Sequence, residues 1–196
     1  MAIWVKICGL TTGEAVEAAV AAGADAVGFV FAPSKRQVTA ARAVELSQSV
    51  PRRIPRVAVM LHPTQSQLDE VWSVFRPDVL QTDAEDLESL RVPDGLAAMP
   101  VIRGATARNY PRVLFEGPVS GIGSTSDWNS AAQLARTTQL VLAGGLNATN
   151  VGDAIAAVRP FGVDVSSGVE ATPGIKDPAK IHEFVRRARA ASDRSS

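Results

Sequence analysis

Short apolar segments alternate with amphipathic, alanine-rich segments along the whole length of the 196-residue chain. The apolar segments are rich in β-branched residues and are continuously apolar, which is typical of parallel strands covered on both faces. Eight segments of this kind predict strands, at residues 3–7, 26–30, 56–60, 78–81, 99–102, 112–115, 140–142 and 163–165. This alternation favours an α/β fold built on a parallel sheet.

Helices are predicted between the strands, at residues 12–22, 39–48, 64–75, 86–90, 129–136, 148–158 and 178–190. Repeated strand-then-helix units imply right-handed connections within one sheet, and this number of units predicts a closed, single-domain (β/α)8 TIM barrel with eight parallel strands. Segment 105–110 is short for a helix, so the fifth helix is predicted to be short or missing. An open doubly wound sheet is the alternative, although no GxGxxG motif follows the first strand.

No linker or low-complexity segment divides the chain, so the catalytic barrel is predicted to cover residues 1–189. Residues 190–196 are small, polar and terminal, and they are predicted to form a flexible C-terminal tail.

Charge and cysteine content restrict the partners and the compartment. The 20 Lys and Arg residues balance 20 Asp and Glu residues, so no overall field favours nucleic acid or an anionic membrane. The most apolar stretch, 15–32, contains Glu17, Asp25 and two glycines, which is not the pattern of a membrane span. The single cysteine cannot form an internal disulfide, and no signal-peptide pattern is present, so a cytoplasmic protein is expected. No cluster of residues has the spacing of metal ligands, and no metal site is expected.

In a parallel barrel, the loops that follow the strands meet at one face, where ligands bind. Cys8 ends the first strand, where a thiol can act as a base or nucleophile, although a lone cysteine is more often a small buried apolar residue. Arg36 follows the second strand, Gln81 ends the fourth, and Glu116 follows the sixth. These residues are candidates for a site at this face.

The last two loops predict a phosphate site. At Gly144 and Gly145 the backbone N–H groups can approach an anion without a Cβ atom in the way. Ser166, Ser167 and Gly168 can begin a short helix, whose free N–H groups favour an anion. Because barrels often bind phosphate between the loops after strands seven and eight, a phosphorylated small molecule is the expected ligand.

Four motifs give the chain a family likeness along nearly its whole length. They are KICGLT at 6–11, GFVF with SKR at 28–36, LAGGLN at 142–147, and VDVSSGVE at 163–170 followed by PGIKD. On these motifs the chain resembles the phosphoribosylanthranilate isomerases, barrel enzymes of tryptophan biosynthesis. The resemblance implies an Amadori rearrangement, in which N-(5-phosphoribosyl)anthranilate opens its ribose ring and becomes 1-(2-carboxyphenylamino)-1-deoxyribulose 5-phosphate.

The resemblance also implies roles for individual residues. Cys8 would be the general base, and Glu116, at the end of strand six, would be the general acid. Arg36 would hold the anthranilate carboxylate, Gln81 would be a further substrate contact, and Asp164 would lie beside the reacting sugar. The phosphate ligands would be Gly144, Gly145, Ser166, Ser167 and Gly168. The chemistry needs an acid for the ring oxygen and a base for the adjacent carbon, without a metal or cofactor.

The chain departs from the family pattern at two places. The family acid is usually an aspartate, whereas Glu116 is longer by one methylene, and Asp127 and Asp164 are the alternative acids. Asp127 precedes a predicted helix, where an N-capping role is the stronger interpretation. On strand four, Asp83 stands where the family often has a histidine, which affects the expected substrate contacts rather than the reaction class.

Two other functions are compatible with the same motifs. One is a related isomerase of the histidine-pathway type, whose substrate carries two phosphates and would need a second Gly-rich loop, for which Gly121 and Gly123 are the candidates. The other is a barrel that binds a phosphorylated ligand without turnover. A monomer is expected, with a homodimer as the alternative.

Overall fold

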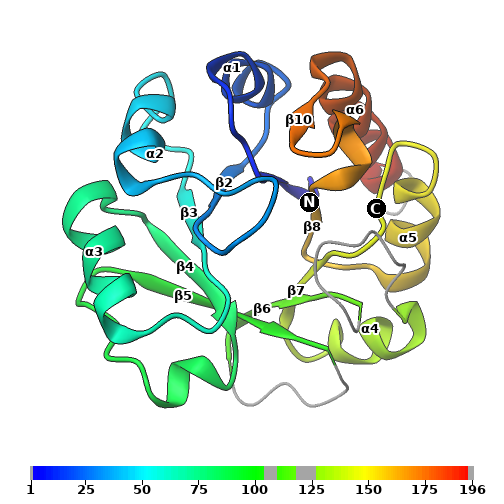
Figure 1. Ribbon diagram of the computed structural model, residues 1–196. Coiled ribbons are helices and arrows are strands. Elements are labelled where there is room, and N and C mark those ends of the chain that lie inside the picture. The colour runs from blue at the N-terminus through cyan, green and yellow to red at the C-terminus, as the bar shows by residue number, and fades with distance from the viewer. Residues whose placement is uncertain (1, 104–109, 118–126, 194–196) are drawn as a thin grey trace.

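The computed structural model describes residues 2–103, 110–117 and 127–193, and in these the predicted barrel is present (Figure 1). The eight strands pair in parallel with their neighbours in chain order, and β8 pairs with β1 to close the barrel. The strands are β1 (Trp4–Cys8), β2 (Ala26–Val30), β3 (Arg56–Val59), β4 (Val79–Asp83), β5 (Ala97–Ile102), β6 (Arg112–Phe115), β7 (Gln139–Leu142) and β8 (Gly162–Val165).

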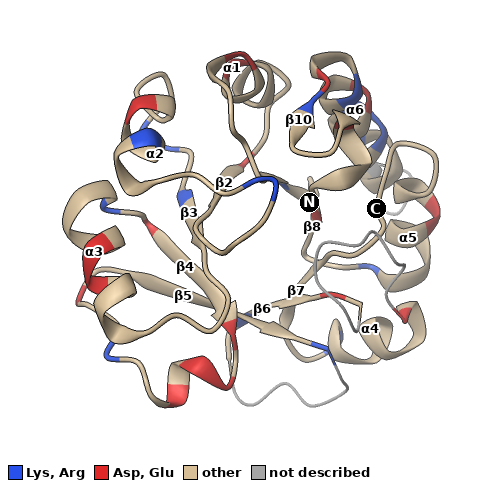
Figure 2. Ribbon diagram, viewed as in Figure 1, with Lys and Arg blue, Asp and Glu red and all other residues tan. Residues whose placement is uncertain are grey.

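Helices surround this barrel on the outside (Figure 1). They are α1 (Gly13–Ala21), α2 (Ala40–Leu46), α3 (Gln65–Phe75), α4 (Trp128–Leu134), α5 (Val151–Val158) and α6 (Pro178–Asp193). Threonines begin the first three, because the side chains of Thr12, Thr39 and Thr64 accept hydrogen bonds from first-turn backbone N–H groups. Lys and Arg are interspersed with Asp and Glu around the ring of helices (Figure 2).

Two predicted segments differ in the structure. The helix predicted at 86–90 is only a single turn of 3₁₀ helix, η1 (Asp86–Glu88). Pro93 follows closely and disfavours the helical conformation at the residue before it. Helix α6 continues to Asp193, and Ala191 and Ser192 are buried, so the helix extends into the segment predicted as a tail. Residues 194–196, and residues 104–109 where a short or missing fifth helix is predicted, lie outside the described part of the chain.

A small hairpin interrupts the last strand-to-helix connection. The short helix η2 (Ser167–Val169) follows β8, and the antiparallel strands β9 (Glu170–Thr172) and β10 (Ile175–Lys176) lead from it into α6. The sequence analysis predicts a short helix here but not the hairpin, because two strands of three and two residues are below the length that apolar periodicity can identify.

The strands direct alternate side chains into two cores. On β1, Val5 and Ile7 pack outward against the helices, whereas Trp4 packs against the inner cluster of Ala26, Val57, Met99, Val101, Leu114, Val141 and Ala143. Because side chains alternate along a strand, Lys6 and Cys8 share the inward face with Trp4. The barrel therefore places Cys8 at the end of its interior where the strands finish. No helix among the described residues is long and apolar enough to cross a membrane.

Candidate active site

A cavity of about 200 Å³ lies at the ends of the strands. Six of the residues that the sequence predicts for the site line it, and they come from five different strands or the loops that follow them: Cys8, Arg36, Gln81, Glu116, Asp164 and Ser166. A larger hollow of about 620 Å³ is lined mainly by residues of the loops after β2 and β3 and of α3. None of the predicted catalytic or binding residues lines that hollow, so the smaller cavity is the candidate active site.

Cys8 sits beside a buried ion pair. The Lys6 ammonium contacts Asp164 Oδ1 at 2.8 Å, and the lysine side chain is fully buried. Burial raises the pKa of the Cys8 thiol, and the nearby cations of Lys6 and Lys176 only partly oppose this rise. The pKa of Lys6 is also raised, because Asp164 and Cys8 outweigh the effect of its burial. Lys6 is therefore a permanent cation next to the thiol.

Gly28 makes room for this pair of side chains. A Cβ atom at position 28 would lie 3.1 Å from both Cys8 Sγ and Lys6 Cε. Cys8 and Gly28 are register partners on β1 and β2. The glycine in the GFVF motif is therefore needed for the cysteine to lie at this position.

Glu116 lies beyond the end of β6 and is held by an arginine from the neighbouring strand end. Arg103, just after β5, contacts Glu116 Oε1 at 2.8 Å and Asp83 Oδ1 at 2.8 Å. The pKa of Arg103 is raised by these two carboxylates despite its partial burial. Asp83 therefore contacts the arginine that holds Glu116.

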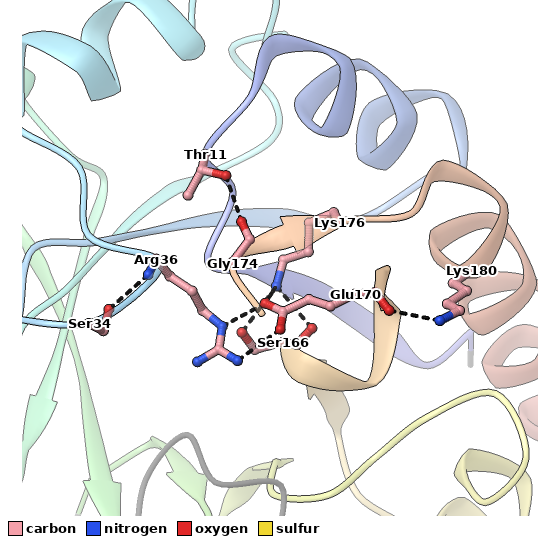
Figure 3. A network of polar contacts seen from close by, with 8 residues as sticks. All are labelled: Thr11, Ser34, Arg36, Ser166, Glu170, Gly174, Lys176 and Lys180. Atoms are coloured by element: carbon pink, nitrogen blue, oxygen red, sulfur yellow. Dashed lines mark hydrogen bonds and ion pairs between the residues drawn. The ribbon is translucent and has the colours of Figure 1, made fainter. Parts of the chain in front are cut away.

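Arg36 belongs to a second polar network (Figure 3). Its Nε donates to Glu170 Oε1 at 2.7 Å and its Nη2 donates to Glu170 Oε2 at 3.0 Å. Lys176 Nζ donates to Glu170 Oε1 at 2.9 Å, and also to the Ser166 backbone carbonyl and hydroxyl at 2.9 and 3.2 Å. Arg36 is thus tied to η2 and the β9–β10 hairpin by a bidentate ion pair.

Gln81 presents a buried acceptor to the cavity. It is 6% exposed, and its Oε1 atom has no hydrogen-bond partner among the residues that the structure describes. A buried acceptor without a partner costs about 1–3 kcal/mol, so this atom is suited to a donor on a ligand.

The predicted phosphate loops lie against each other. Gly144 and Gly145 have φ angles of +88° and +65°, a conformation that favours glycine. A Cβ atom on Gly168 would lie 1.9 Å from the Leu146 carbonyl oxygen, so this glycine permits η2 to approach the loop after β7. Ser166 lines the cavity and Ser167 an adjoining hollow, whereas Gly144, Gly145 and Gly168 line neither.

The alternative acids occupy other environments. Asp127 caps α4 by accepting hydrogen bonds from the backbone N–H groups of Asn129 and Ser130, as the sequence predicts. Asp164 is paired with Lys6. The candidate second phosphate loop, Gly121 and Gly123, lies outside the described residues.

His62, Asp83 and Asp86 form a cluster that the sequence does not predict. One potential ligand atom from each lies within 4.8 Å of the others. These atoms already have protein partners, since His62 Nδ1 and Thr82 Oγ1 contact Asp86 at 2.9 and 2.6 Å, and Asp83 binds Arg103.

Four residues of the site escape sequence reasoning: Lys6, Arg103, Glu170 and Lys176. Lys6 carries a local signal, because it is two residues before Cys8 and so shares its strand face. Arg103 directly follows a predicted strand, as Glu116 does. Glu170 and Lys176 lie within the family motifs, but their contacts depend on a hairpin that the sequence does not predict.

Comparisons with known proteins agree with these motifs. Residues 5–187 match the family model described as N-(5'-phosphoribosyl)anthranilate (PRA) isomerase. An N-(5'-phosphoribosyl)anthranilate isomerase of Streptococcus pneumoniae (strain Hungary19A-6) is 40% identical over 190 residues, covering 94% of this chain and 95% of its own. A protein of the same name from Mesorhizobium japonicum is 38% identical over 215 aligned residues, covering 98% of both chains.

Solved structures agree as well. The phosphoribosyl anthranilate isomerase of Thermotoga maritima superposes with a TM-score of 0.83 at 34% identity, covering 96% of this chain and 99% of its own. Another structure of a phosphoribosyl anthranilate isomerase was solved with reduced 1-(o-carboxyphenylamino)-1-deoxyribulose 5-phosphate. It has a TM-score of 0.80 at 33% identity, covering 96% of this chain and 99% of its own.

Proposed function

Because this chain belongs to the N-(5'-phosphoribosyl)anthranilate isomerase family, we propose that Cys8 is its general base and Glu116 its general acid. The chain catalyses the isomerisation of N-(5'-phosphoribosyl)anthranilate in tryptophan biosynthesis. The observation that most supports the two roles is that Cys8 and Glu116 line one cavity of about 200 Å³ together with Arg36.

The reaction needs one proton donor and one proton acceptor. Glu116 donates a proton to the ribose ring oxygen as the C1–O bond breaks, while the nitrogen lone pair forms the C=N bond of a Schiff base. The Cys8 thiolate then removes the proton from C2, and the electrons of that C–H bond flow toward the nitrogen. The resulting enolamine becomes the ketone when C1 gains a proton and the C2 hydroxyl group loses one, so the sequence of steps moves hydrogen from C2 to C1 without a cofactor.

Cations lie next to both groups, although burial still keeps the pKa of Cys8 above its usual value. The Lys6 ammonium and the Lys176 ammonium favour the thiolate form of Cys8. Arg103 contacts Glu116 Oε1 at 2.8 Å and so holds the carboxyl group at the end of β6. Asp83 contributes by contacting the second side of the Arg103 guanidinium.

The remaining residues bind the substrate. We assign the anthranilate carboxylate to Arg36, a ribose hydroxyl to the free Oε1 atom of Gln81, and a place beside the reacting sugar to Asp164. The backbone N–H groups of Gly144 and Gly145 donate no hydrogen bond to the described residues, so they are available to an anion. The phosphate is therefore assigned to the loops after β7 and β8: Gly144, Gly145, Ser166, Ser167 and Gly168.

The decisive experiment measures turnover of N-(5-phosphoribosyl)anthranilate by the purified wild-type protein and by Cys8→Ser, Glu116→Gln and Glu116→Asp. General acid–base groups contribute about 10²–10⁴-fold, so the Ser and Gln variants are expected to lose that much in kcat. The Asp variant keeps the carboxyl group but is shorter, and it is expected to retain partial activity.

Asp127→Asn is the matched control for Glu116→Gln, since asparagine is also a good N-cap residue. It is expected to turn over at the wild-type rate. Full activity of Glu116→Gln would show that Glu116 is not the acid, and loss of kcat in Asp127→Asn instead would move that role to Asp127. Growth of a tryptophan auxotroph that lacks this step gives the same comparison in cells.

We also infer a cytoplasmic monomer. The large apolar side chains that are exposed among the described residues are scattered over separate elements: Val44, Leu61, Val74 and Ile175. Such isolated residues do not make the contiguous apolar patch that a stable dimer buries. Light scattering after gel filtration tests this, and a mass of twice 20.6 kDa would contradict it.

A further inference from the structure

We propose that Glu170 is a positioning residue that presents Arg36 to the ring carboxylate of the substrate. It thereby determines the preference of the enzyme for a substrate that carries this carboxylate. The inference rests on the proposed function, in which Arg36 binds that group.

The geometry of the ion pair leaves half of the guanidinium available. A guanidinium has two edges that can bind a carboxylate in bidentate fashion, one formed by Nε and one Nη nitrogen and the other by both Nη nitrogens. Glu170 occupies the first edge, through Nε and Nη2. Nη1 donates no hydrogen bond to any described residue and lies on the side of the guanidinium away from Glu170 (Figure 3). The second edge is therefore free for a second carboxylate.

Glu170 is itself held from two sides. Lys176 donates to its carboxylate at 2.9 Å, and Lys180 donates to its backbone carbonyl at 2.7 Å. The Lys176 side chain is fully buried and also binds Ser166, so the carboxylate cannot move independently of η2. A free arginine side chain has about 2 kcal/mol of rotamer entropy to lose on binding. Contact with a fixed carboxylate removes much of this cost before the substrate arrives.

The charges of the network still favour an anion. Arg36 and Lys176 are two cations facing one carboxylate, which leaves one net positive charge. Burial alone would raise the pKa of Glu170, but the hydrogen bonds from Arg36 and Lys176 outweigh it and lower the pKa. Glu170 therefore stays ionised at neutral pH and keeps the guanidinium oriented.

The test compares two substrates. One is N-(5-phosphoribosyl)anthranilate, and the other is the corresponding phosphoribosylamine of aniline, which lacks only the ring carboxylate. Wild type, Glu170→Gln, Arg36→Met and the double variant are assayed with both. Glu170→Gln is expected to raise KM for the anthranilate substrate roughly tenfold, with kcat changed less than about threefold. The kinetic constants for the aniline substrate are expected to stay at their wild-type values.

The double variant separates an indirect role from a direct one. If Glu170 acts through Arg36, the double variant is no worse than Arg36→Met alone. Asp25→Asn is the control for the loss of an ion-paired carboxylate. Asp25 Oδ2 contacts Arg189 Nη2 at 2.7 Å, and this pair lies at the other end of the barrel. It is expected to leave the ratio of kcat/KM for the two substrates unchanged.

The possible failures are distinguishable. If Arg36→Met impairs both substrates equally, the assignment of Arg36 is wrong and the present inference falls with it. If Arg36→Met abolishes the preference but Glu170→Gln keeps it, only the role of Glu170 is wrong. Equal impairment of both substrates by Glu170→Gln would make Glu170 merely structural. If Glu170→Gln does not fold, Glu170→Asp keeps the charge with a shorter reach, and loss of the preference is again the expected result.

Discussion

At the scale of single residues, the proposed chemistry depends on the ionisation of the Cys8 thiol. The pKa of Cys8 is raised by burial, so the protonated thiol predominates at neutral pH. The thiolate fraction is then expected to increase about tenfold per pH unit as pH rises toward the folded-state pKa, and the rate of alkylation of Cys8 should increase with it. Because the folded state binds this proton more tightly than the unfolded chain, the matching contribution to stability is lost as pH rises through the folded-state pKa.

Alkylation by iodoacetamide, followed by mass spectrometry, checks this prediction, since Cys8 is the only cysteine in the chain. Cys8→Ser should take up no label. An alkylation rate that is already constant by pH 6 would contradict a raised pKa of the Cys8 thiol.

Some residues of the site could be predicted from the sequence and others could not, and the reason is physical. Cys8, Arg36, Gln81 and Glu116 could be predicted because a parallel barrel gathers strand ends at one face, whatever their distance along the chain. Their partners could not, since the Arg36–Glu170 contact joins residues 134 positions apart through a hairpin without a periodic signal. The phosphate loops were predicted from glycine chemistry. Gly144 and Gly145 have positive φ angles, and their role in binding phosphate stays a prediction.

At the scale of the elements, the contact between η2 and the loop after β7 requires a residue without a side chain at position 168. Gly168→Ala would place a methyl group 1.9 Å from the Leu146 carbonyl oxygen. We expect it to lower the free energy of unfolding by about 1–3 kcal/mol and to weaken inhibition by inorganic phosphate, because the two loops must separate.

Gly13→Ala is the matched control for Gly168→Ala, since a Cβ atom at position 13 meets nothing within 4 Å. It lies in the first turn of α1 and is expected to increase stability by about 0.4–1 kcal/mol. Urea titration of both variants tests the pair. Equal effects of the two substitutions would show that the close approach at Gly168 is unimportant.

The elements themselves were predictable where their signal was long. All eight strands of the barrel lie where apolar segments indicated them, because a strand covered on both faces is mostly apolar. Prediction was poorest for short segments that depend on particular contacts. Segment 86–90 has helix-compatible residues, but there the Asp86 side chain binds Thr82 and His62, and only a 3₁₀ turn forms.

At the scale of the whole molecule, Arg189 joins the last helix to the first strands. From α6 it donates to the backbone carbonyl of Ile3, to that of Gly23 at 3.0 Å, and to Asp25 at 2.7 Å. Arg189→Met leaves these acceptors without their donor, and we expect a loss of about 1–3 kcal/mol in the free energy of unfolding.

Arg187→Met is the control on the same helix. Among the described residues Arg187 pairs with Glu183 alone, and its side chain is 57% exposed, so its removal should change stability by less than about 0.5 kcal/mol. The two variants are compared by urea denaturation at equal protein concentration. Similar losses would show that the contacts of Arg189 with Ile3 and with the turn before β2 contribute nothing specific to stability.

The pairing of β1 with β8 has a consequence for folding during synthesis. During synthesis, the β8-facing edge of β1 leaves the ribosome with unsatisfied backbone groups and stays so until nearly the whole chain has been translated. An open edge of this kind is a template for misassociation between nascent chains. Slower translation would prolong that exposure, so this barrel should depend most on chaperones in the interval before its last strand emerges.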